Sequence, residues 1–114
     1  FLRYESPIQS AARIAMEGIK IGGQRIDKGQ RVTLMLGAAN RDRERFSNPD
    51  RLDITREDTR HLSFGFGSHF CLGSVLARVE GQIVIGTVVQ LAGDDFEWRY
   101  NPSFRSLISL PVAY

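Results

Sequence analysis

The stretch "FGFGSHFCLG", residues 64–73, decides the fold, and it contains the only cysteine of the chain. Glycines stand at positions 65, 67 and 73, on both sides of that thiol. Glycine accepts positive φ and the close approach of other groups, so this backbone can bend around one side chain. From Leu72 onward apolar residues recur every three or four positions, which predicts a helix that ends near Gly93. Cys71 therefore lies beside a helix N-terminus, where unpaired N–H groups and the helix dipole favour a thiolate.

The residues alone leave more than one use for this thiol. A lone cysteine in an apolar setting is most often an inert buried side chain. A zinc site is poorly supported, because Cys71, His69 and His61 are at most three ligands and lack a paired spacing. A cysteine nucleophile with His61 or His69 as its base stays an open alternative. The other interpretation is a thiolate beneath a large, flat apolar group, since three phenylalanines stand close to it in the sequence: Phe64, Phe66 and Phe70.

The first third of the chain predicts a helix end followed by a small sheet. "FLRYES", residues 1–6, is typical of a helix already under way, and the proline that follows stops it. Residues 10–36 predict one small antiparallel sheet, with turns at 22–23 and 28–29 where glycines stand.

The middle and the end of the chain predict a long loop, the helix and short strands. Residues 41–60 hold six arginines and six acidic residues, which is typical of a solvated loop with ion pairs. Within the helix, Gly81 and Gly86 predict close packing against a neighbour, because glycine costs a helix about 1 kcal/mol relative to alanine. Short strand-like pieces follow, divided by a proline at position 102.

Composition narrows the classes of protein that fit. The 114 residues are 42% hydrophobic and 25% charged, as in a globular protein, and the net charge of +2 is too small to argue for nucleic acid. Residues 75–92 are apolar but carry two charges and two glutamines, so no membrane span is expected. One cysteine and no secretory start favour a cytoplasmic location. Because the chain opens on Phe1 within a helix pattern, we expect it to be a fragment of a larger protein.

A family resemblance rests on "FGFGSHFCLGSVLAR", residues 64–78, which resembles the haem-ligand loop and following helix of the cytochrome P450 monooxygenases. The pattern of that family is a phenylalanine, a glycine-bearing bulge, a basic residue, the cysteine and a second glycine. Here these positions are Phe64, Gly67, His69, Cys71 and Gly73. Histidine replaces the arginine that is commonest in the family, as in many soluble bacterial members.

Further matches extend the resemblance over nearly the whole chain. Arg3 falls on the arginine of the family's Glu-x-x-Arg motif, whose glutamate would come immediately before Phe1. "PDRL", residues 49–52, resembles the meander motif, and Arg51 would join the Glu–Arg pair. Arg13 matches a position that binds a haem propionate.

The resemblance implies a fold class that is mixed, mainly α with small antiparallel β-sheets. Residues 1–114 would be the C-terminal, haem-ligating part of a single larger domain whose N-terminal part is absent from this chain. That part comprises the end of the K helix, a small sheet, the meander, the cysteine loop, the L helix and terminal strands of the cytochrome P450 fold.

The resemblance also implies roles for single residues. Cys71 would be the axial ligand of the iron of haem b. His69 and Arg13 would contact propionates, and the remaining residues would shape the loop or the helix around the cofactor: Phe64, Gly65, Gly67, Gly73 and Ala77. The segment before the sheet would line the substrate pocket through Ile8, Gln9, Ala11 and Ala12. No other catalytic residue would lie within this chain.

The function implied is that of a monooxygenase that activates dioxygen and oxidises a small hydrophobic substrate. Electrons would come from a ferredoxin or flavodoxin, which Arg60, Arg78 and other arginines would contact. No nucleic-acid or membrane partner is expected. The fragment alone would not turn over, because the acid–alcohol pair used in dioxygen activation lies outside it. The alternatives are a haem-binding fragment or sensor, and a cysteine hydrolase that uses Cys71 and His61.

Overall fold

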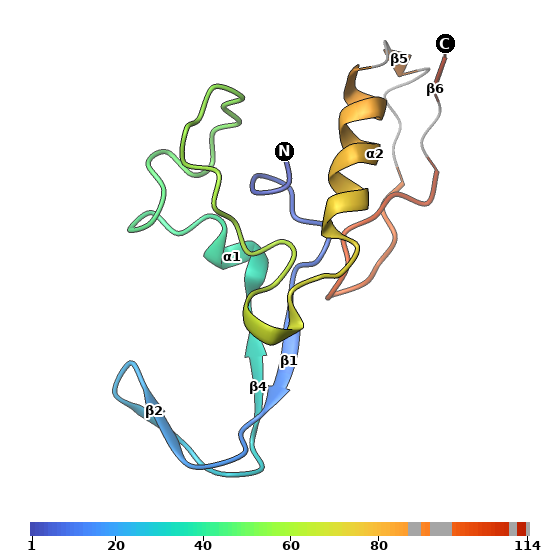
Figure 1. The fold of residues 1–114 in the computed structure, drawn as a ribbon. Coiled ribbons are helices and arrows are strands. Elements are labelled where there is room, and N and C mark those ends of the chain that lie inside the picture. Colours follow the sequence, from blue (N-terminus) through green and yellow to red (C-terminus); the bar gives the residue numbers. More distant parts are fainter. Residues whose placement is uncertain (87–89, 92–96, 110–111, 114) are drawn as a thin grey trace.

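The computed structural model describes residues 1–86, 90–91, 97–109 and 112–113. The molecule is elongated, with extents of 54 × 31 × 26 Å and a radius of gyration of 17.0 Å (Figure 1). A compact domain of this length has a radius of gyration of about 13 Å. The elements are therefore spread out rather than gathered around one centre.

Two short antiparallel ladders form the lower half of the molecule in Figure 1. Strand β1 (Ala11–Ile14) pairs with β4 (Arg31–Leu34), so that Ala11 lies opposite Leu34. Between them, β2 (Ile19–Ile21) and β3 (Gln24–Ile26) form a separate hairpin. Its turn residues 22 and 23 have φ of +55° and +82°, as a two-residue turn with two positive φ values requires. The prediction of one sheet over 10–36 was wrong in this respect, because the chain leaves the first ladder at Ala15 and returns to it at Gln30.

The helices are few among the described residues. A single helical turn opens the chain, where the N–H of Glu5 donates to the carbonyl of Phe1 over 2.8 Å. Helix α1 (Leu36–Ala39) follows β4, and the 3₁₀ turn η1 (Gly67–His69) precedes α2 (Ser74–Gly86). The predicted helix end at Gly93 lies outside the described residues. No described helix has the length and apolarity that crossing a bilayer requires.

The C-terminal segment returns to the start of the chain. The N–H of Gln9 donates to the carbonyl of Ser103, and that of Arg105 donates to the carbonyl of Pro7. Ile8 and Phe104 form an antiparallel bridge between these two segments. Farther along, β5 (Gln90–Leu91) pairs with β6 (Val112–Ala113). The hydrogen bonds of Gln9 and Arg105 therefore join segments that lie about 95 residues apart in sequence.

Very little apolar surface is buried within the described chain. The buried hydrophobic side chains are Ala15 and Phe46, whereas Leu76 on α2 is 62% exposed. Apolar residues do recur along α2 as predicted, but no described segment covers the face that they form. For Gly81 and Gly86 the expected close neighbour is also missing, since an added Cβ would meet no described atom within 4 Å.

Candidate functional site

The cysteine loop closes on itself through backbone hydrogen bonds. The N–H of Cys71 donates to the carbonyl of Phe64 over 2.9 Å, and the N–H of Phe70 donates to the carbonyl of Gly67 over 3.0 Å. The carbonyl of Cys71 then accepts from the N–H of Ser74, the first residue of α2. These bonds hold the thiol at the outer end of the loop, where Cys71 is exposed.

Two glycines permit this shape through their backbone angles. Gly65 has φ of +76° and Gly67 has φ of +74°, values that L side chains adopt only with strain. Space is not the constraint, because a Cβ on Gly67 would meet nothing within 4 Å and one on Gly65 would lie 3.6 Å from a carbonyl. Gly73 differs from them: a Cβ there would lie 3.9 Å from the sulfur of Cys71, an ordinary contact. Of the two reasons for glycine that the sequence suggests, positive φ is therefore the one that the described atoms require at Gly65 and Gly67.

An aromatic cluster lies behind the loop. The ring of Phe64 is 5.7 Å from that of His61, tilted by 52°, and 6.3 Å from that of Phe70, nearly edge-on. The guanidinium carbon of Arg78 lies 5.3 Å from the centre of the Phe64 ring. Phe64 thus has two aromatic rings and one guanidinium group as neighbours. Its own carbonyl accepts a hydrogen bond from the N–H of Cys71.

His61 is held in its neutral form. Its Nδ1 accepts a hydrogen bond of 3.2 Å from the N–H of Ser63, which leaves the proton on Nε2. Burial lowers the pKa of His61 below its usual 6.5, and the positive charge of Arg78 lowers it further. These contacts do not direct His61 toward the thiol, so the structure gives no support to a Cys71–His61 pair.

A buried polar network fixes the segment that leads into the loop. Asn40, which is 1% exposed, donates through Nδ2 to the hydroxyl of Ser63 and accepts through Oδ1 from the N–H of Leu62. The Ser63 hydroxyl donates to the carbonyl of Leu2 over 2.6 Å. The guanidinium of Arg3 donates to the carbonyl of Asn40 over 2.6 Å. Sequence reasoning assigned no role to Asn40 or Ser63, and only the "NRD" triplet at 40–42 could have directed attention to the first.

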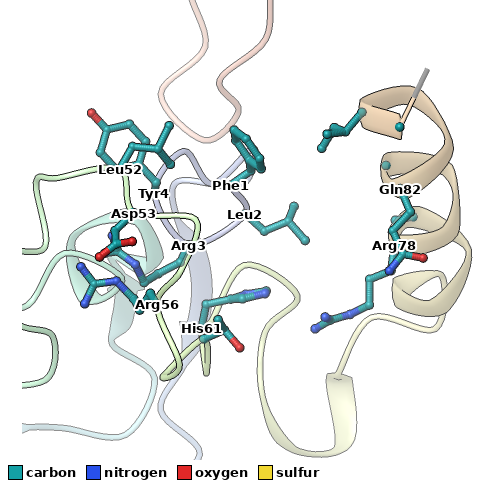
Figure 2. A pocket seen from close by; sticks show the side chains of 15 residues that line it. Phe1, Leu2, Arg3, Tyr4, Leu52, Asp53, Arg56, His61, Arg78 and Gln82 are labelled. Carbon is teal, nitrogen blue, oxygen red and sulfur yellow. The ribbon is translucent and has the colours of Figure 1, made fainter. Parts of the chain in front are cut away.

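A cavity of about 690 Å³ lies between the N-terminal turn, residues 52–61 and α2 (Figure 2). Cys71 does not line this cavity. Arg3 and Arg56 line it, and the Nε of Arg56 is buried without a described hydrogen-bond partner. Arg51 does not line it, and its side chain is exposed. The role that the resemblance gives to Arg51 stays a prediction. Burial lowers the pKa of Arg3, and the positive charges of Arg56 and Arg41 lower it further.

Most of the other residues singled out from the sequence lie outside the loop, whereas His69 lies within it. Arg13 is exposed on β1 and donates to the carbonyl of Ala12, and His69 is exposed in η1. The side-chain amide of Gln9 donates to the carbonyl of Ser6 and lies against Gly37. Ala77 lines the cavity described above. Near the start of the chain, Ile8 and Ala11 are half-buried and Ala12 is exposed.

The chemistry of the donor set fits haem better than a free metal ion. Among the described residues no group of three or more His, Cys, Asp or Glu side chains could hold a metal. A single exposed thiol can serve as the protein ligand of a haem iron, because the haem ring itself supplies four nitrogen ligands. Around it the loop presents open apolar side chains: Phe66 is 85% exposed and Leu72 is fully exposed. These residues could cover a flat apolar ring.

Comparison with known proteins defines the class to which this site belongs. A family profile named Cytochrome P450 matches residues 1–105, and the chain belongs to that family. It is 56% identical to the biotin biosynthesis cytochrome P450 of Bacillus subtilis (strain 168) and 46% identical to cytochrome P450 107B1 of Saccharopolyspora erythraea. These matches cover 99% and 97% of this chain.

Solved structures agree with the sequence relatives. P450BioI, in complex with acyl carrier protein ligated to hexadec-9Z-enoic acid, superposes with a TM-score of 0.87 at 53% identity over 99% of this chain and 31% of that one. CYP109E1 from Bacillus megaterium, in complex with testosterone, gives 0.90 at 31% identity over 97% and 33% of the two chains. The chain spans 30% of the length of each of the two curated relatives named above. Small antiparallel sheets with few helices are consistent with a part of that fold.

Proposed function

We propose that this chain is the C-terminal, haem-ligating part of a longer bacterial monooxygenase that binds haem b through Cys71. The observation that supports this most is the exposed thiol at the end of a loop shaped by two positive-φ glycines. A haem iron held by a thiolate gains the electron density that favours cleavage of the O–O bond of dioxygen. Within this chain Cys71 would hold the iron, and Arg13 and His69 would receive the propionates.

The loop's backbone would keep the sulfur in place. The Cys71 N–H donates to the carbonyl of Phe64, and the Cys71 carbonyl accepts from the N–H of Ser74 at the start of α2. Phe64 would exclude water from the sulfur on the side where its carbonyl already binds the Cys71 N–H. Glycine at 73 leaves the space beside the sulfur open to a flat ring.

The substrate and the electron donor are proposed from chemistry and from relatives. We expect a hydrophobic substrate that Ile8, Gln9, Ala11 and Ala12 help to line, and a ferredoxin or flavodoxin as donor. One relative is named for biotin biosynthesis and another for polyketide biosynthesis, and a similar structure holds a fatty-acyl carrier protein. These names favour an acyl chain as the class of substrate. A cytoplasmic location stays a prediction.

The test is a carbon-monoxide difference spectrum of the reduced full-length protein. We expect the wild type to show the band of a thiolate-ligated haem and Cys71→Ser to lose it, with Ser68→Ala in the same loop as the matched control. A wild type that takes up no haem would overturn the proposal and leave the hydrolase. A thiolate band without substrate turnover would favour the sensor.

A further inference from the structure

The ring of Phe64 is contacted on two sides, by the ring of His61 and by the guanidinium of Arg78. His61 contributes a tilted ring at 5.7 Å, from the segment before the loop. Arg78 contributes its guanidinium at 5.3 Å, from the first turns of α2. In Figure 2 the His61 ring and the Arg78 side chain point toward one another from opposite walls of the cavity.

Hydrogen bonds fix the orientation of His61, and α2 positions Arg78 relative to the loop. The Nδ1 of His61 accepts from the N–H of Ser63, and Ser63 is itself bonded to Asn40 and to the carbonyl of Leu2. Arg78 lies on α2, whose first N–H groups bond back to the loop. Phe64 therefore connects the buried network on one side with the thiol on the other.

We propose that His61 and Arg78 are positioning residues that fix Phe64, whose carbonyl accepts the Cys71 N–H, and so set the reduction potential of the iron. This inference rests on the proposed function, since it concerns a thiolate-ligated haem. The ring contact of His61 is the component that matters most, because it constrains the tilt of Phe64. Solvent access to a ligating sulfur is one of the factors that tune such potentials.

The direction of the effect follows from charge. Reduction adds one negative charge to the iron centre, and water beside the sulfur stabilises that charge. Loss of the His61 ring frees Phe64 and admits water, so the potential moves to more positive values. We expect about a tenfold change in the ratio of reduced to oxidised protein at a fixed potential, which is about 59 mV for one electron.

The experiment measures the midpoint potential of the haem-loaded, full-length protein in four variants. His61→Ala removes both the ring and the acceptor, His61→Phe keeps a ring, and His61→Asn keeps only an acceptor for the Ser63 N–H. We expect a positive shift for His61→Ala and His61→Asn, and a potential near the wild type for His61→Phe. Arg25→Ala, which removes an exposed arginine from β3, is the control and leaves the potential unchanged.

Several outcomes would overturn the inference. One is an unchanged potential in His61→Ala that still shows the thiolate band, and another is rescue by His61→Asn but not by His61→Phe. If His61→Ala does not fold, the comparison of His61→Phe with His61→Asn decides in its place. Failure of the proposed function looks different, because the wild type would then show no thiolate band.

Discussion

At the scale of single residues, the thiol depends on backbone angles more than on side-chain space. Sequence reasoning identified Cys71, Gly65 and Gly67 from their spacing, because a positive-φ bulge needs glycine wherever it occurs. It named both positive φ and close approach as reasons for glycine, and the described structure supports the first at Gly65 and Gly67. Asn40 and Ser63 were beyond prediction, since their partners lie about 20 to 60 residues away in sequence.

Gly67→Ala tests the torsional requirement in the full-length protein. A Cβ at φ of +74° costs about 1–2 kcal/mol, although nothing stands within 4 Å of it. We expect a lower urea midpoint and a smaller fraction of thiolate-ligated haem. Gly18→Ala is the matched control, because its Cβ would lie 4.0 Å from a carbonyl and its φ is not positive. Equal effects of the two substitutions would contradict the torsional explanation.

At the scale of elements, composition predicted the loop of residues 41–60 but not its partners. Its balanced charges do form ion pairs, such as Arg45 with Asp58 and Arg41 with Asp50. Which arginine pairs with which acidic residue depends on the turns of the loop, and the hydrophobic periodicity of the sequence does not predict these turns. The same limit explains the sheet: apolar alternation predicts strands, but the division into two ladders is set by backbone hydrogen bonds of Ala15 and Gln30.

The pH dependence of this loop follows from Asp58. Its carboxylate accepts hydrogen bonds from Arg45 over 2.6 Å and from Arg60 over 3.4 Å, which lower its pKa from 3.8 to about 2. A carboxyl with a depressed pKa stabilises the fold above its unfolded pKa of 3.8, and this contribution disappears as pH falls through about 2.

We expect Arg45→Gln to raise the pKa of Asp58 toward 3.8, because the hydrogen bond from Arg45, which lowers this pKa most, is then lost. Carboxyl chemical shifts of aspartate-labelled protein, followed from pH 7 downward, measure it. Arg25→Gln, which removes the partner of Asp27 on the distant hairpin, is the control and leaves Asp58 unchanged. A pKa of Asp58 that stays near 2 in Arg45→Gln would show that Arg60 alone holds it down.

At the scale of the whole molecule, the described chain has a candidate site but very little buried hydrophobic core. The amphipathic pattern of α2 was read correctly from the sequence, yet its apolar residues are exposed here. Burial of a helix face depends on what packs against it. The sequence pattern predicts which face is apolar, but not which segment covers that face. Since the chain spans about a third of its relatives, we propose that other parts of a full-length protein cover this apolar stripe, defined by Leu72 just before α2 and by Val75, Leu76, Val79 and Ile83 within it.

Leu76→Ala decides whether the stripe is covered. Leu76 is 62% exposed in this chain, and truncation of a side chain that stays exposed changes the free energy of unfolding by within about 0.5 kcal/mol. If the full-length protein buries it, the same substitution costs about 2–5 kcal/mol, because both transfer free energy and packing are lost. We expect the larger value from urea unfolding of the full-length, haem-loaded protein. Ile21→Ala, on the β2–β3 hairpin and 58% exposed, is the matched aliphatic control with a smaller expected cost. A loss below about 0.5 kcal/mol for Leu76→Ala would mean that the stripe faces solvent in the complete molecule as well.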